Sequence, residues 1–264
     1  MGLVKKSFPS SFRFSTDAMK LIAVTAMFID HLPLAFGTGS YYTFPVILMH
    51  MLGRFTAPIM FYGIVKGYHH TRNANRYMGR LLIFALISYA PYIYYFEGAW
   101  PNSENFLQLN VLFSLFLGLL ALRAKKEIRI RLLRYGAIGG IFLLSLFTEW
   151  QFLGILLILL FYSFSEDRRA MSISYALVIL TYSFSMSDRL FRYLPEIREQ
   201  DLITFLPYLL VISSMLLPLL VIRNASGQKG HISFPGGKWF FYIFYPLHIV
   251  FLICLRAFLL GGFW

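Results

Sequence analysis

Residues 17–36 read DAMKLIAVTAMFIDHLPLAF, an apolar run interrupted near its end by Asp30 and His31. A run of about 20 apolar residues is long enough to cross the hydrocarbon core of a bilayer as an α-helix. An ionisable side chain at the middle of a bilayer costs roughly 2.5 to 3.5 kcal/mol, so such residues normally face a protein interior or a wet cavity. In a shorter helix the two residues would lie among lipid headgroups, but Leu32 to Phe36 continue the apolar run. We interpret the pair as a functional site inside a transmembrane helix.

The same predicted helix carries both a cation, Lys20, and a titratable base, His31. Lys20 and His31 are eleven residues apart, so they share one helical face at about 16 Å along the axis. Pro33 removes a backbone hydrogen bond one turn earlier, and we expect a bend just beyond His31 that opens space beside the imidazole.

Composition assigns the chain to the integral membrane proteins. Of its 264 residues 58% are hydrophobic and 14% are charged, whereas a soluble domain carries about 25% charged residues. The net charge of +12 does not require a nucleic-acid partner, because the positive-inside rule explains basic residues that gather in alternate loops. Cys254 is the single cysteine, which excludes an intrachain disulfide. Adjacent His69 and His70 point in different directions and match no metal motif, so we expect no metal site.

Hydropathy predicts an all-α fold, a polytopic membrane bundle of about nine transmembrane helices forming one domain over residues 1–264. Two of these spans are short, so about eight or ten spans are alternatives. Basic residues gather in the loops on the side of the N-terminus, which predicts an inside N-terminus and an outside C-terminus. The expected spans are residues 18–36, 43–66, 77–96, 106–122, 132–148, 150–165, 170–187, 202–222 and 239–260.

Polar side chains share one layer of this bundle, from the middle to the outer half of the membrane. Asp30 and Arg54 as unpaired charges would cost roughly 5 to 7 kcal/mol together, so we expect them to pair. Successive helical residues point about 100° apart, so Asp30 pairs with Arg54 or His248 rather than with His31. A purely structural ion pair is the alternative, and it leaves His31, Tyr245 and His248 unexplained. The layer holds Asp30, His31, His50, Arg54, Asn110, Tyr245 and His248.

Arg72, Arg76 and Arg80 are spaced by four and predict a cationic stripe at the inner end of the third span. The positive-inside rule alone would explain them. The second interpretation is a phosphate clamp, since guanidinium groups match phosphate oxygens in a bidentate way.

Seven segments in this order resemble the TraX type of conjugal transfer membrane protein. They are TDAMKLIA (16–23), MFIDH (27–31), LGRFTAPI (52–59), KGYHHTRN (66–73), RLLIFALIS (80–88), LNVLF (109–113) and FYPLH (244–248). The first helix is also similar to that of wider transmembrane acyltransferase families, in which a basic residue precedes a catalytic His by eleven positions. This chain has Lys20 where Arg is common there, and Glu149-Trp150-Gln151 where the TraX family often has Asp-Tyr-Gly.

The resemblance implies an acetyl-CoA-dependent acetyltransferase of the bacterial cytoplasmic (inner) membrane that modifies a pilin-like amino terminus. It implies that cytoplasmic acetyl-CoA has its phosphates near Lys20, Arg72, Arg76 and Arg80 and its thioester reaching toward His31. Asp17 is a further candidate cofactor-binding residue. His31 would act as general base or briefly carry the acetyl group. Arg54, Asn110 or Tyr245 would hydrogen-bond the developing oxyanion, and Asp30 and His248 complete the candidate catalytic set.

Three alternatives stay open. The acceptor could be a glycan hydroxyl. The same buried Asp, His and Arg would suit a proton-coupled transporter, although we find no inverted repeat. A non-enzymatic assembly partner would tolerate replacement of Asp30 and His31. We expect membrane lipids as partners, allow a homo-oligomer and expect no nucleic acid.

Overall fold

The computed structural model describes residues 13–38, 43–191, 199–226 and 237–262. Within these ranges the chain is all α-helical, as predicted, and outside the helices it has only two isolated bridges, Phe14 with Ala225 and Leu109 with Thr148. The helices are α1 (Thr16–Ala35), α2 (Phe44–Gly53), α3 (Thr56–His70), α4 (Ala74–Ile87), α5 (Tyr89–Glu97), α6 (Val111–Glu127), α7 (Arg131–Ser145), α8 (Gln151–Ser163), α9 (Arg168–Phe191), α10 (Glu199–Ser213), α11 (Pro218–Arg223) and α12 (Phe240–Leu260), with short 3-10 turns at Ser214–Leu216 and Gly237–Trp239.

Several helices are long and apolar enough to cross a membrane, as the composition predicts. Among the described residues these are Thr16–Ala35, Phe44–His70, Leu206–Arg223 and Phe240–Leu260, and the pair α4 and α5, bent by 43°, adds a fifth if it is one span. Helix α8 is apolar but has only 13 residues. The expected count of about nine spans and the inside N-terminus therefore stay predictions.

Two predicted spans are broken helices. Helix α2 ends at Gly53 and α3 begins at Thr56, so Arg54 lies in a two-residue junction whose backbone keeps helical dihedral angles. Together the two helices form the 27-residue candidate span Phe44–His70. Helix α4 ends before Ser88, whose side chain donates to the carbonyl of Phe84 at 2.7 Å. Such side-chain bonds to the preceding turn bend helices. Hydropathy alone does not register either break, because the apolar run continues through both.

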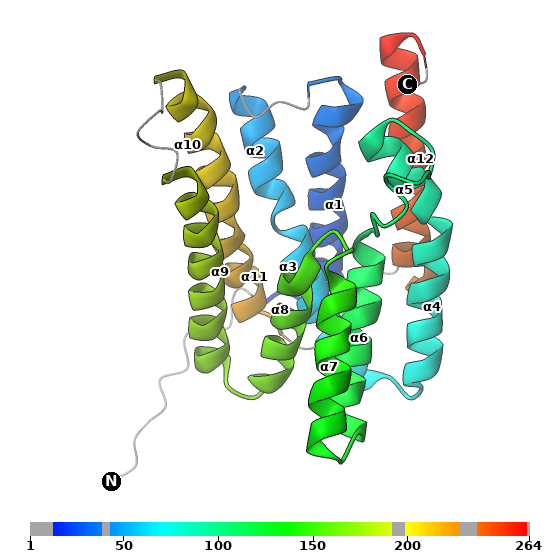
Figure 1. Cartoon of the computed structure of the whole chain (residues 1–264), viewed down its shortest axis with the longest axis vertical. Helices are drawn as coiled ribbons and strands as arrows, with labels where there is room; N and C mark the ends of the chain where they lie inside the picture. The colour runs from blue at the N-terminus through cyan, green and yellow to red at the C-terminus, as the bar shows by residue number, and fades with distance from the viewer. Residues whose placement is uncertain (1–12, 39–42, 192–198, 227–236, 263–264) are drawn as a thin grey trace.

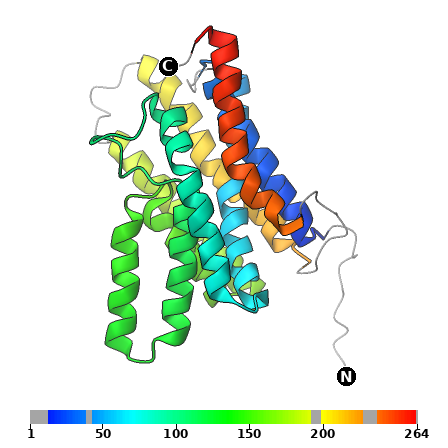
Figure 2. The same cartoon turned by 90° about the vertical axis from the view of Figure 1, so that its right-hand side faces the viewer.

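Figures 1 and 2 show the helices side by side in one bundle, with α1 packed against α2, α3 and α12. Helix α6 packs against α4, α7 and α8, and α7 lies at the periphery. The turns α3–α4, α6–α7 and α8–α9 lie at the same end as the beginning of α1, the lower end in Figure 1. We call this the basic end, because the α3–α4 and α6–α7 turns and the beginnings of α4 and α7 carry Arg72, Arg76, Arg129 and Arg131.

The backbones of α1 and α2 approach closely at Gly53. A Cβ atom at this position would lie 2.2 Å from the Cγ atom of Asp30, closer than atoms can approach without a shift of the backbone or the carboxylate. The absence of a side chain at Gly53 therefore lets the Asp30 carboxylate lie against α2, where its charge partners are.

Candidate functional site

Asp30 of α1 forms the centre of an ionic cluster with two residues near the end of α2. Its carboxylate accepts from Nη2 of Arg54 at 3.0 and 3.3 Å and lies 2.8 Å from Nδ1 of His50. Arg54 also donates through Nε to the carbonyl of His50 at 3.3 Å and lies over the ring of Trp150 at 6.0 Å. The predicted Asp30 to Arg54 pair is confirmed, and His50 is a partner that sequence reasoning did not assign.

His31 points away from Asp30 and contacts His248 of α12. Nδ1 of His31 lies 3.1 Å from Nε2 of His248, and the two rings are stacked with centroids 5.3 Å apart. Nδ1 of His248 lies 3.1 Å from the carbonyl of Phe244. The prediction that Asp30 does not pair with its neighbour His31 is therefore confirmed. The contact between His31 and His248 joins residues that are 217 positions apart.

With both rings taken as neutral imidazoles, these contacts assign one tautomer to each ring. A carbonyl can only accept, so Nδ1 of His248 donates to Phe244 and Nε2 of His248 is the acceptor. The proton between the two rings then belongs to Nδ1 of His31. Nε2 of His31 then carries a lone pair and has no hydrogen-bond partner among the described residues. A general base requires this arrangement.

The end of α1 that carries His31 is fixed by two donors that sequence reasoning missed. The hydroxyl of Tyr95 donates to the carbonyl of His31 at 2.7 Å, and Nη1 of Arg256 donates to the carbonyl of Leu34 at 2.5 Å. The last carbonyls of a helix lack partners within it, and Pro33 removes one further donor. The missing N–H of Pro33 affects the carbonyl of Ile29 rather than those of His31 and Leu34, so the sequence carries no local signal for these two contacts.

Asn110 and Tyr245, the two uncharged members of the predicted catalytic set, have different surroundings. Asn110 is fully buried, caps α6 by accepting from the backbone N–H of Leu112 at 3.0 Å, and donates to the carbonyl of Ala85 at 3.0 Å. Both contacts are structural, and a catalytic role for Asn110 stays a prediction. Tyr245 is 1% exposed, contacts the ring of His248 with centroids 5.4 Å apart, and its hydroxyl proton has no acceptor among the described residues.

A cavity of about 580 Å³ leads from the basic end to Tyr245. Its polar lining includes Asp17, Lys20, Lys66, His70 and Arg80. Its interior is apolar and is lined by Ala23, Val24, Met27, Ile59, Ile64, Leu112 and Leu115, among others. His31 and His248 do not line it, so Tyr245 lies between the cavity and the histidine pair.

Three cations of the cavity are held by aromatic rings. Lys20 lies 5.0 Å from the ring centre of Phe241 and 3.8 Å from the carboxylate of Asp17. The Arg80 guanidinium lies between Tyr77 and Tyr242, at 5.8 and 5.7 Å from their ring centres. Lys66 lies 5.4 Å from the ring centre of Tyr62. Contacts with aromatic rings orient a cation without neutralising it, whereas the Asp17 carboxylate offsets part of the charge of Lys20.

Two arginines of the predicted phosphate clamp lie outside this cavity lining. Arg72 precedes α4, because Asn73 caps the helix by accepting from the backbone N–H of Arg76 at 2.9 Å. The prediction of one helical stripe through Arg72, Arg76 and Arg80 is therefore wrong at Arg72. Arg76 is helical but exposed, and Arg80 alone of the three lines the cavity. Lys66 and His70, which sequence reasoning did not assign to the site, line it as well.

Comparison with known proteins gives two matches along most of the chain. A family model described as TraX protein matches residues 15–256. A probable fimbrial assembly protein FimC, serogroup H1, of Dichelobacter nodosus is 30% identical over 250 residues, which cover 93% of this chain and 97% of that protein. No solved structure matches the chain.

Proposed function

The chain belongs to the TraX family, and on that premise we propose that it is a membrane acetyltransferase. It moves the acetyl group of cytoplasmic acetyl-CoA to an acceptor amine at the outer half of the membrane. The observation that carries this proposal is the cavity that runs from the cations Lys20, Lys66 and Arg80 through apolar walls to Tyr245. A ligand with an anionic head and a long, weakly polar arm fits this distribution, and coenzyme A has that form.

The proposed donor geometry follows from charge and polarity along the cavity. The phosphates of coenzyme A bind Lys20, Lys66 and Arg80, and the pantetheine arm lies along Met27, Ile59 and Leu115. The thioester then reaches Tyr245, whose unpaired hydroxyl proton donates to the thioester oxygen as negative charge develops on it. Because the cavity begins at the basic end, this proposal requires that end to face the cytoplasm, in agreement with the positive-inside rule.

In the proposed reaction the acceptor amine attacks the thioester carbonyl, and Nε2 of His31 takes the proton that the amine loses. The C–S bond breaks, coenzyme A leaves as a thiolate, and the proton on His31 returns to the sulfur. The products are an acetylated amine and the free thiol. His248 orients His31 through the bond between the two rings, while the Asp30, His50 and Arg54 cluster fixes α1 against α2.

The acceptor in this proposal is a pilin-like peptide amino terminus, because the relative in D. nodosus is described as a fimbrial assembly protein. A glycan hydroxyl uses the same proton transfer to His31 and is the second candidate acceptor. A proton-coupled transporter would also need buried ionisable groups, but it does not need a cavity with cations at its mouth and apolar walls that lead to Tyr245.

Acetyl-CoA binding tests the donor site. We expect Arg80→Gln and Lys20→Gln to weaken binding of acetyl-CoA to the purified protein about 10- to 100-fold, because a hydrogen bond to a charged group contributes about 1.5 to 3 kcal/mol. Isothermal titration calorimetry measures the dissociation constants. Arg76→Gln is the matched control, since Arg76 lies on the same helix but outside the cavity lining.

The control should change the dissociation constant less than twofold, and the melting temperatures of all three variants should be recorded to exclude unfolding. Equal weakening by Arg76→Gln and Arg80→Gln would mean that the arginines act only through the net charge of the basic end. Absence of acetyl-CoA binding to the wild type would remove the donor site and favour a transport or assembly function.

A further inference from the structure

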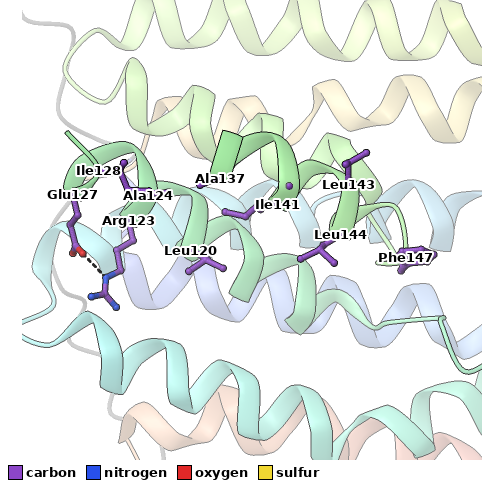
Figure 3. A pocket seen from close by; sticks show the side chains of 11 residues that line it. Leu120, Arg123, Ala124, Glu127, Ile128, Ala137, Ile141, Leu143, Leu144 and Phe147 are labelled. Carbon is purple, nitrogen blue, oxygen red and sulfur yellow. Dashed lines mark hydrogen bonds and ion pairs between the residues drawn. The ribbon is translucent and has the colours of Figure 1, made fainter. Parts of the chain in front are cut away.

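A second hollow lies between α6 and α7, on the side of the bundle away from α12. It has a volume of about 720 Å³ and its lining is apolar except for Arg123 and Glu127. Figure 3 shows these two residues at one end of the groove, beside the α6–α7 turn, and Leu143, Leu144 and Phe147 at the other end. Arg123 and Glu127 pair with each other at 2.8 Å. The groove is therefore apolar along its length and ends at the most basic turn of the chain.

Gly140 of α7 lines the groove and has open space beside it. A Cβ atom at Gly140, which lines the groove, would have no heavy atom within 4 Å, and the same holds for Gly139, which does not line it. Glycine in membrane helices commonly lets a neighbouring helix approach closely. Here no described segment occupies the space, and Leu143 beside it is 67% exposed.

The lining of the groove favours an acyl chain as its occupant. Its side chains are apolar along most of its length, and its two polar residues stand together at the end beside the α6–α7 turn. A phospholipid has the same division, with an apolar chain and a charged headgroup at one end.

Basic residues at the end of the groove beside the α6–α7 turn favour a lipid with an anionic headgroup. Residues 123–134 carry six basic residues and one acidic residue. Lys125 and Lys126 lie over the rings of Tyr162 and Tyr68. Arg129 and Arg131 are exposed, and among the described residues neither has an ion pair. An anionic headgroup gains about fivefold in binding for each Lys or Arg near it.

We propose that the α6–α7 groove binds one acyl chain of an anionic phospholipid, with the lipid phosphate at the turn beside Arg129 and Arg131. The site is separate from the donor cavity and does not depend on the proposed acetyl transfer. In this proposal the exposed arginines of the α6–α7 turn bind the lipid phosphate in addition to setting the orientation of the chain in the membrane.

Native mass spectrometry of the full-length protein, released from a neutral detergent, tests this proposal. The probes are phosphatidylglycerol and phosphatidylcholine with identical acyl chains, added at equal concentrations. We expect wild-type protein to retain phosphatidylglycerol preferentially. Gly140→Leu adds a side chain to the groove lining at a position where a Cβ atom meets nothing within 4 Å and should reduce this retention at least fivefold, whereas the neighbouring Gly139→Leu should leave it unchanged. The double variant Arg129→Gln, Arg131→Gln should lower phosphatidylglycerol retention to the level of phosphatidylcholine.

Equal retention of the two lipids by the wild type would overturn the headgroup assignment. Equal retention by the Gly140→Leu and Gly139→Leu variants would overturn the groove as the site. A dimer that Gly140→Leu dissociates would assign this face to a second copy of the chain and would also overturn the proposal. Because the readout is bound lipid, it is independent of acetyl transfer, and either proposal can fail alone.

Discussion

Replacing Arg54 by methionine is expected to lower the free energy of unfolding by up to about 3 to 5 kcal/mol, the cost of removing one partner of a fully buried ion pair, since the side chains of Arg54 and Asp30 are only 24% and 16% exposed. Nη2 of Arg54 donates to both oxygens of Asp30, at 3.0 and 3.3 Å. Methionine fills similar space but leaves the carboxylate with His50 as its remaining partner in the cluster. Reversible denaturation of the purified protein in detergent, followed by tryptophan fluorescence, measures the change.

The double variant Asp30→Asn, Arg54→Met separates the lost ion pair from lost packing. Removing both charges leaves no unpaired carboxylate, so the double variant should be more stable than Arg54→Met alone. A loss below about 1 kcal/mol for Arg54→Met, the range of exposed ion pairs, would contradict the cluster as described. So would a double variant whose loss equals the sum of the two single losses.

Replacing His248 by leucine is expected to slow acetyl transfer about 100-fold or more, the range that general base catalysis contributes. Leucine cannot accept the proton of Nδ1 of His31, so the base is free to rotate and to adopt the wrong tautomer. His248→Gln is the conservative variant, because an amide oxygen can accept the same hydrogen bond. We expect it to recover most of the rate.

Two further measurements show whether His248 acts by orienting His31 or through a general effect on the structure. The dissociation constant of acetyl-CoA should be the same in wild type, His248→Leu and His248→Gln, because His248 does not line the donor cavity. ¹⁵N NMR of labelled histidine should show one protonated Nδ1 on His31 in the wild type and in His248→Gln. Equal rates in the leucine and glutamine variants would show that the bond between the rings has no part in the reaction.

Local features of the fold could be predicted from the sequence because they depend on short-range physics. The expected span at 18–36 corresponds to α1 (Thr16–Ala35), and the span at 239–260 to α12 (Phe240–Leu260). The pairing of Asp30 with Arg54 followed from the cost of two unpaired charges in hydrocarbon. In each case the sequence itself supplies a large free-energy term.

Other features of the site depended on tertiary contacts or on signals that were present but not used. The contact of His31 with His248 requires α1 and α12 to pack in one register, which no local pattern specifies. Asn73 and Asn110 belong to a residue type that commonly caps helices, and each stands just before a helix. Using them would have placed Arg72 outside α4 and assigned Asn110 a structural contact.

The most direct test of the proposed function is release of free thiol from acetyl-CoA by purified protein, with an unblocked peptide as acceptor. Wild type should release thiol only when the peptide is present, and the peptide should gain one acetyl group by mass spectrometry. His31→Ala should release none above background while it still binds acetyl-CoA and keeps its melting temperature. Release that is the same in His31→Ala and wild type would contradict the assignment of His31 as the base.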